Sequence, residues 1–278
     1  LSRLGYSVAV LEAHRVGFGA SGRNGGQLGA GQRVSQDELV SYLGEKHAHN
    51  LWLLAKDAVN TVKEIITTNK IDCHLKPGVA TLGFNSKEVN GLHQYAEYLE
   101  KKYNYDGLEK LDHKVCSAIC GSEKYKGGIL DMNAAHLHPL RFVFGLAKAA
   151  IQAGADIFEK SEVTSLLPGK VNRTLTNSGE IQSEFVVLGC NGYLGNLEQK
   201  VAAKVMPINN FIVATEPLGD RAESVLAKDI AVADTKFVVN YFRLSDDKRL
   251  LFGGGENYSY KFPANITSTV LKQMLEIF

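Results

Sequence analysis

The sequence is poor in cysteine and contains no long apolar run. Four cysteines in 278 residues are too few for a disulfide framework and fit a reducing compartment, so we expect a cytoplasmic protein. No stretch approaches the roughly 18 consecutive apolar residues that a membrane helix needs. No basic-then-apolar signal segment opens the chain. We therefore expect no membrane partner.

An excess of charge of either sign is also missing. Lys and Arg number 31 and Asp and Glu number 30, which gives a net charge near +1. This balance provides no electrostatic attraction for nucleic acid or for an anionic membrane surface. Nucleic-acid partners are therefore not expected, and any partner has to be argued from a specific site.

Clear start and stop signals are lacking at both ends. Leu1 is not a methionine, and "LSRLGYSVAVLEA" indicates the end of a helix, a stop at Gly5 and then a strand. The last residues, "ITSTVLKQMLEIF", form an amphipathic helical pattern without a glycine stop. We interpret the chain as a fragment, long enough for two domains that share an interface.

Apolar spacing divides the chain into helices and strands. We expect one long helix over residues 37–69, a short helix capped by Asp112, and a helix that starts at Pro139 and stops at Gly154. Strands are expected at 7–13, at "KPGVATLGF" and at "ADIFE" and "EVTSLLPG", with a further β run at "FVVLG". Beyond residue 205 the pattern is mostly β.

These elements predict an α/β fold with two domains in discontinuous pieces. Residues 1–35 and 139–200 have α/β character and are expected to form one domain. Residues 36–138 and 201–278 are expected to form a second, α+β domain with a mostly antiparallel sheet.

Glycine is abundant immediately behind the first strand. The stretch "GFGASGRNGGQ" at residues 17–27 follows "VAVLEA", and seven glycines occur between residues 17 and 31. Side-chain packing alone cannot hold such a loop, so we expect a ligand to order it. A flexible surface loop is the alternative, but such loops carry more Ser, Pro and charge than this one, whose one charged side chain is Arg23.

Glu12 stands at the end of the first strand. In dinucleotide-binding units an acid at this point binds ribose hydroxyls, about 20 residues after a G-x-G-x-x-G loop that would here precede residue 1. Gly22, Gly25 and Gly26 would allow backbone N–H groups to approach a large ligand, and short polar side chains nearby would bond it. A solvated carboxylate at a strand end is the alternative for Glu12.

The stretch "VAVLEAHRVGFGASGRNGGQ" resembles the second strand and following loop of FAD-dependent oxidoreductases of the D-amino-acid oxidase type. The likeness is greatest to the γ-glutamylputrescine oxidoreductase branch of that family. "HPLRFVFGLAKAAIQAGADIFEKSEVTSL", "FVVLGCNGYLG" and "YFRLSDDKRLLFGGG" resemble later segments of the family in the same order. The resemblance implies a partial Rossmann-like FAD-binding domain at 1–35 and 139–200, and a partial substrate domain in the remaining segments.

The resemblance also implies cofactor contacts. Glu12 would hold the adenosine ribose. Adenine would lie beside Ala13, His14, Arg15 and the backbone of Val163. The pyrophosphate, ribityl chain and flavin edge would run along Ser21, Gly22, Arg23, Asn24, Gly25, Gly26 and Gln27. A turn beside the cofactor would be formed by Cys190, Asn191 and Gly192. Because the first glycine loop and the last glycine segment of the family are absent, we expect weak or absent FAD in this chain.

The resemblance implies oxidation of a C–N bond in a small amine or amino-acid-like substrate. An imine and then an aldehyde would form, and dioxygen as electron acceptor would give hydrogen peroxide, as in polyamine catabolism. The alternatives are an amine or amino-acid dehydrogenase of the same fold that passes electrons to a carrier, and a non-catalytic nucleotide-binding relative.

The sequence gives weaker signals for residues that contact the substrate than for those that contact the cofactor. Tyr241 and Arg243 alternate on one strand and so share a face, where Arg243 would pair with a substrate carboxylate. A surface arginine near Asp246 and Asp247 is the alternative. Trp52 and Tyr193 are candidates for the pocket wall, although an apolar helix face also explains Trp52. No residue is predicted to be catalytic.

A metal site is not predicted. His113, Cys116 and Cys120 share one helical face, but three such ligands are too few for a closed structural zinc site. His136 and His138 precede a predicted helix with no carboxylate nearby in the sequence, so we expect them to cap the helix rather than bind a metal.

Overall fold

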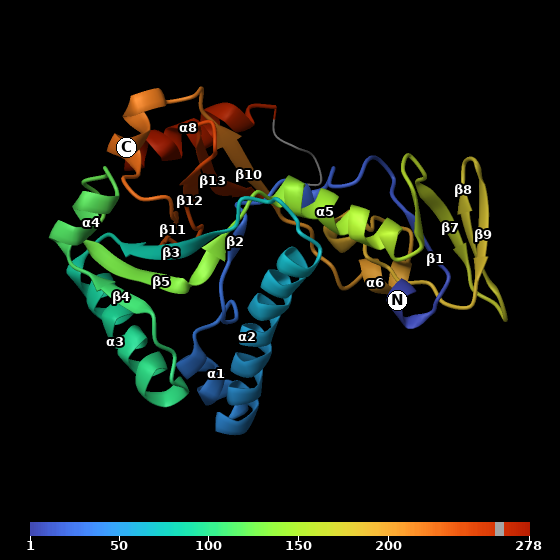
Figure 1. Ribbon diagram of the computed structural model, residues 1–278, viewed down its shortest axis with the longest axis horizontal. Coiled ribbons are helices and arrows are strands. Elements are labelled where there is room, and N and C mark those ends of the chain that lie inside the picture. The colour runs from blue at the N-terminus through green and yellow to red at the C-terminus, as the bar shows by residue number, and fades with distance from the viewer. Residues whose placement is uncertain (259–263) are drawn as a thin grey trace. The chain divides into compact units, whose positions relative to one another are not determined.

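The computed structural model describes residues 1–258 and 264–278. The chain forms two compact units, each made of separate segments (Figure 1). Unit 1 comprises Leu1–Asn24, Leu140–Asn209 and the short stretch that begins at Asn257, and unit 2 comprises Gly25–Pro139, Asn210–Glu256 and the C-terminal segment. Discontinuous units were expected. The assignment of cofactor to the first domain and substrate to the second stays a prediction.

Unit 1 is organised around two parallel strands. Strand β1 (Val8–Leu11) pairs with β6 (Ala155–Phe158), with Val8 opposite Ala155. Helix α5 (Pro139–Gln152) precedes β6, as expected from Pro139 at its first turn. An antiparallel sheet follows, made of β7 (Val163–Leu167), β8 (Asn172–Thr176) and β9 (Gly179–Ser183). Short helical turns complete the unit: η1 (Ser2–Leu4), η2 (Ala20–Gly22), η3 (Asn191–Tyr193) and α6 (Gln199–Ala202).

The β run expected at "FVVLG" is wrong. Residues 185–190 lie in no helix or strand, and Phe185 and Val187 are 72% and 79% exposed. A strand exists only where a neighbour pairs with its backbone groups. Within the described part of the chain no strand does so here. The apolar composition indicated a preference for burial, which this segment does not achieve.

Unit 2 is built on a larger sheet. In the described residues this sheet has eight strands in the order β10-β13-β12-β11-β3-β5-β2, with β4 beside β5. The pairs β13–β12, β12–β11, β3–β5, β5–β2 and β4–β5 are antiparallel. The pair β11–β3 is parallel. The strands are β2 (Gln27–Leu28), β3 (Lys76–Gly83), β4 (Leu108–Leu111), β5 (Gly127–His136), β10 (Asn209–Ala214), β11 (Ala231–Asp234), β12 (Tyr241–Leu244) and β13 (Leu250–Asn257).

The long helix expected over 37–69 is two helices. Helix α1 (Gln36–Leu43) and helix α2 (Glu45–Thr68) meet at Gly44, which has a φ of 77°. An L residue rarely adopts this conformation, so the glycine breaks a pattern whose apolar spacing continues through it. The other helices of unit 2 are α3 (Ser86–Tyr103), α4 (His113–Ile119), η4 (Gly219–Arg221), α7 (Ala222–Val225) and α8 (Ile266–Ile277). Asp112 caps α4 as predicted, since its Oδ1 accepts the Val115 N–H at 2.8 Å.

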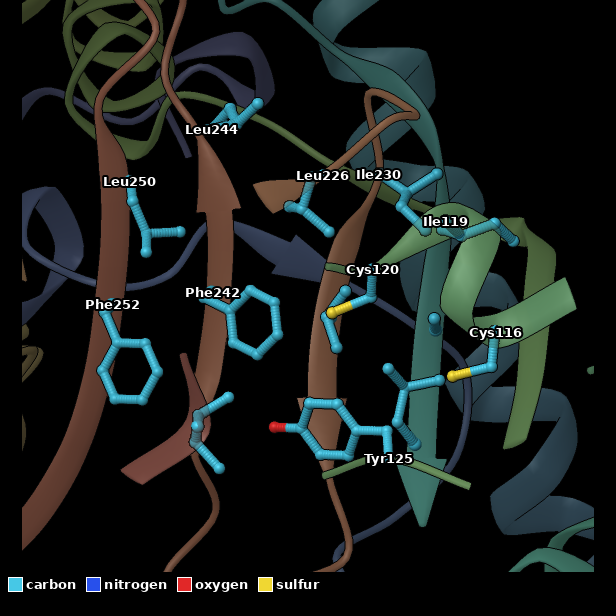
Figure 2. Close-up of a cluster of buried hydrophobic side chains, with 14 of the residues drawn as sticks. Cys116, Ile119, Cys120, Tyr125, Leu226, Ile230, Phe242, Leu244, Leu250 and Phe252 are labelled. Atoms are coloured by element: carbon cyan, nitrogen blue, oxygen red, sulfur yellow. The ribbon is translucent and has the colours of Figure 1, made fainter. Parts of the chain in front are cut away.

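The main hydrophobic core belongs to unit 2 (Figure 2). The rings of Phe242 and Phe252 stack with centroids 5.8 Å apart on neighbouring strands. Tyr125 lies beside Phe242, and its hydroxyl donates to the buried carboxylate of Asp234 at 3.2 Å. Helix α8 covers the cluster with Val270 and Ile277. This packing fixes β12, the strand that carries Tyr241 and Arg243.

No helix in the described residues is long and apolar enough to cross a membrane.

Candidate cofactor site

The carboxylate of Glu12 lies where the parallel strands of unit 1 end. Its backbone N–H donates to Phe158 O at 2.9 Å, which extends the pairing of β1 and β6 by one step. Its Oε1 accepts the His14 N–H at 2.9 Å, so the half-buried side chain is held in one orientation. A carboxylate held at the carboxyl ends of parallel strands is suited to accept hydrogen bonds from ribose hydroxyls.

The turn after β1 is joined to the connection between β6 and β7. Three hydrogen bonds make the join: Lys160 N–H to His14 O at 2.7 Å, Ser161 N–H to Glu12 O at 2.8 Å, and Val16 N–H to Glu159 Oε1 at 2.8 Å. The structure thus brings together the turn that contains Ala13, His14 and Arg15 and the connection that leads to Val163, the first residue of β7.

Internal contacts order the loop at residues 17–24. The Arg23 Nε–H donates to Phe18 O at 2.6 Å, and the guanidinium lies 4.7 Å from the centre of the Phe18 ring. The Asn24 amide donates to Ala20 O and Ser21 O at 3.0 and 3.1 Å. Polar side chains within the loop thus bond its own carbonyls, and the further ordering of this loop by a ligand stays a prediction.

Two loop glycines are required by close approaches of the backbone. A Cβ on Gly22 would overlap Gly17 O, and a Cβ on Gly26 would overlap Leu137 O. Gly26 also has a φ of 74°, and its carbonyl accepts the Leu137 N–H at 2.8 Å. These glycines allow the loop to pass close to neighbouring chain.

The tyrosine and tryptophan candidates lie in different surroundings. Tyr193 is 62% exposed, and a Cβ on Gly19 would lie 3.1 Å from its ring. Trp52 is 2% exposed and packs against Tyr103 and Tyr105 at centroid distances of 5.5 and 5.0 Å. Trp52 is thus a core residue of α2.

The turn at Cys190 to Gly192 lies in unit 1. Asn191 has a φ of 50°, and its Oδ1 accepts the Gly192 N–H at 2.8 Å. Cys190 is half-buried and carries a free thiol. A Cβ on Gly192 would make an ordinary contact with Pro207 at 3.6 Å, so packing does not require this glycine.

Tyr241 and Arg243 both contact Gly25 in unit 2. The Arg243 Nε–H donates to Gly25 O at 2.9 Å, and a Cβ on Gly25 would lie 2.7 Å from the Tyr241 ring. Arg243 is 7% exposed, so the alternative of a surface arginine is wrong. The Gln27 amide donates to Val232 O at 2.9 Å and fixes the next part of the loop to β11.

His136, one of the two histidines expected to cap α5, lies on β5. It is buried on β5 opposite Gln27, and its Nε2 lies 3.1 Å from Asp229 O and 3.7 Å from Asp229 Oδ1. A carboxylate does lie near His136, but it belongs to Asp229, which is 93 positions further along the chain. His136 therefore joins β5 to the segment before β11 and does not cap α5. Its Nδ1 has no hydrogen-bond partner among the described residues.

Burial governs the electrostatics near Gly25. It lowers the pKa of Arg243, against the opposing effect of the Asp246 and Asp229 carboxylates. It lowers the pKa of His136 below its usual range, and so favours the neutral imidazole. It raises the pKa of Tyr241 and so keeps the phenol protonated.

The groups of each unit, taken by itself, fit a part of FAD. In unit 1, Glu12 would supply an acceptor for ribose hydroxyls, and Ser21 in the loop after it has an exposed hydroxyl that could bond a phosphate. Gly25 and Gly26, in unit 2, carry no side chain that would keep a flavin away from their backbone. The part of the chain that the structure describes contains no group of three potential metal ligands.

Curated relatives match the whole chain. It is 38% identical over 279 residues to a probable oxidoreductase, OrdL, of Rhizobium meliloti, and 33% identical over 280 residues to the γ-glutamylputrescine oxidoreductase of Escherichia coli. These alignments cover 100% of this chain but only 65% and 66% of the relatives. The chain thus spans about two thirds of the length of these proteins.

Solved structures show the same fold. Glycine oxidase from Geobacillus kaustophilus matches with a TM-score of 0.71 at 18% identity, over 100% of this chain and 73% of the other. Iminodiacetate oxidase from Chelativorans sp. BNC1 matches with a TM-score of 0.72 at 15% identity, over 100% and 74%. The expected fold class, a Rossmann-like FAD-binding domain in discontinuous segments with an α+β domain, is confirmed.

The model of the DAO family, described as FAD dependent oxidoreductase, matches residues 1–278. With Glu12 at the end of β1 and the glycine loop behind it, the chain belongs to the family of FAD-dependent oxidoreductases.

Proposed function

We propose that the protein containing this chain oxidises a C–N bond in a small amine or amino-acid-like substrate with FAD. The observation that supports this most strongly is the match of the family model to every residue of the chain, with Glu12 held at the end of β1. Glu12, the backbone of residues 13–15 and Val163 would hold the adenosine, and residues 21–27 and the turn at 190–192 would hold the remainder of FAD.

The chemistry follows from the cofactor. When bound, FAD would supply the two-electron acceptor for a hydride that leaves the carbon next to the amine nitrogen. The nitrogen loses a proton, and the resulting imine takes up water and releases an aldehyde or keto product and the amine fragment. Two electrons and two protons passed to dioxygen then give hydrogen peroxide.

The role of the protein is to orient the substrate and to exclude water from the site. Hydride leaves readily from a neutral amine, so a site that disfavours ammonium assists the reaction. The guanidinium of Arg243 provides a positive charge in unit 2 that would disfavour a second cation nearby. No acid–base pair is required, and no compact catalytic motif occurs in the sequence.

The substrate class is proposed from the relative that acts on γ-glutamylputrescine, which is 33% identical. A γ-glutamylated or similar amine carries both a carboxylate and an amine, and would place the protein in polyamine catabolism. The four free cysteines support a cytoplasmic location for such an enzyme.

A dehydrogenase that passes electrons to a carrier is the second candidate. An L-proline dehydrogenase from P. horikoshii matches the fold with a TM-score of 0.71. The two candidates differ in the fate of the electrons and not in the geometry of unit 1.

The test uses the complete reading frame that contains this chain. Purified protein should show the absorption bands of bound flavin, and anaerobic addition of γ-glutamylputrescine or a related amine should bleach them. Hydrogen peroxide released in stoichiometric amounts on admission of air supports the oxidase, and bleaching without peroxide supports the dehydrogenase. Absence of flavin even after reconstitution with excess FAD would support a non-catalytic relative and overturn the proposal.

A further inference from the structure

The ring of Tyr241 lies close to the backbone of two glycines, Gly25 and Gly253. Gly253 stands opposite Tyr241 in the pairing of β12 with β13, and a Cβ on Gly253 would overlap the ring. A Cβ on Gly25 would lie 2.7 Å from Cδ2 and 2.8 Å from Cε2 of the same ring. Neither glycine has a positive φ. The space taken by the ring, rather than backbone conformation, is therefore the reason for glycine at both positions.

The hydroxyl of Tyr241 is also fixed. It donates to Asn210 Oδ1 at 2.6 Å, and the Asn210 amide donates to Gly255 O at 2.9 Å. Both ends of the tyrosine side chain are thus tied to strands of the main sheet. A side chain held in this way makes a rigid surface for Gly25.

Arg243 binds the carbonyl oxygen of Gly25. It lies two positions along β12, on the same face as Tyr241. Its Nε–H donates to Gly25 O at 2.9 Å, and its Nη1–H donates to Leu244 O at 3.2 Å. A hydrogen bond from a charged donor to a carbonyl is stronger than one between neutral groups. Gly25 is therefore held at its Cα by Tyr241 and at its oxygen by Arg243.

We propose that Tyr241 and Arg243 form a clamp on Gly25 that positions the Gly25–Gly26 backbone for the flavin. Arg243 is then a positioning residue that acts through Gly25, and not a ligand of the substrate carboxylate. The residue after Gly25 is fixed independently, because Gly26 O accepts the Leu137 N–H. The clamp and this bond together set two consecutive peptide groups. The link to the flavin rests on the proposed function, whereas the clamp itself does not.

The first test measures the clamp without any cofactor. Gly25→Ala should lower the melting temperature of the chain by several degrees, because the new methyl group meets the Tyr241 ring. In a Tyr241→Ala background the same change should have less than half that effect, because the ring is gone. Gly29→Ala is the matched control, since its Cβ would make only a 3.9 Å contact with Ala134. Equal effects of Gly25→Ala in both backgrounds would overturn the clamp.

The second test separates positioning from substrate binding in the complete reading frame. Arg243→Gln should weaken FAD binding about tenfold and speed hydrogen exchange of the amides at residues 25–28 about tenfold. The ratio of kcat/KM for a carboxylate-bearing amine to that for a matched amine without the carboxylate should stay within about twofold. Arg243→Lys, which keeps a charged donor, should restore part of both losses.

One outcome of the Arg243→Gln experiment would contradict the clamp. A tenfold or larger fall in that kcat/KM ratio, with FAD affinity and hydrogen exchange unchanged, would make Arg243 a substrate ligand and overturn the proposal. Arg173→Gln is the control variant, because that arginine pairs with Glu180 on the β8–β9 hairpin. If the protein binds no FAD, the proposed function fails, but the exchange measurement still decides whether Arg243 holds Gly25.

Discussion

The two units of the chain differ in how much apolar surface they bury. Among the described residues, nearly all buried hydrophobic side chains belong to unit 2, and unit 1 contributes only Ala155 and Leu194. Large exposed side chains occur in both units, for example Leu4 and Phe185 in unit 1 at 76% and 72% and Phe237 in unit 2 at 82%. Unit 2 is thus stabilised by a core of its own, and unit 1 buries much less apolar surface within itself.

The largest expected effect follows from this contrast in burial. Phe252→Ala in unit 2 should lower the free energy of unfolding by about 4 kcal/mol, because the ring is fully buried and stacks on Phe242. Phe185→Ala in unit 1 should change it by less than about 0.5 kcal/mol. Urea unfolding of both variants measures the two values. Similar losses in the two units would remove the contrast.

FAD should reduce the difference between the units. In the complete reading frame, FAD at a hundred times its Kd should stabilise the part that binds it by about 2.7 kcal/mol. Hydrogen exchange in β1 and β6 should therefore slow about a hundredfold, with little change in β12 and β13. Equal protection of all four strands would show that unit 1 is not the principal contact of the dinucleotide.

A smaller effect concerns pH and unit 2. Burial lowers the pKa of His136 in the folded chain, so below about pH 6.5 the unfolded state binds a proton that the folded state does not. Stability is therefore complete above that pH and falls as the pH drops toward the folded pKa. Lys76, Asp229 and Arg243 are the charged groups that act on His136. Urea unfolding at pH 7.5 and 5.5 should show a smaller acid loss for His136→Gln than for the wild type. An identical loss in both would indicate that another group titrates.

Local signals predicted much of the fold. The Asp112 cap, Pro139 at the start of α5 and the strand before Glu12 are set by residues a few positions apart, and the structure has them as expected. The break at Gly44 was missed because the apolar spacing continues across it. The strand at "FVVLG" failed because pairing depends on a neighbour that periodicity cannot show.

Contacts between residues far apart in the chain could not be predicted from the sequence. The bond from Arg243 to Gly25 joins residues 218 positions apart, and the contact of His136 with Asp229 joins residues 93 positions apart. Neither has a local pattern. The sequence did indicate that Tyr241 and Arg243 share a face, because strand alternation is a local property. It could not indicate that this face meets Gly25.

The most direct test of the account is the affinity for FAD of Glu12→Gln compared with that of the wild type, in apoprotein made from the complete reading frame. Glutamine has nearly the same shape but loses the charge and one acceptor. If Glu12 binds the ribose hydroxyls, fluorescence titration should show FAD binding at least about tenfold weaker for the variant. Equal dissociation constants would contradict the placement of FAD along β1 and the glycine loop.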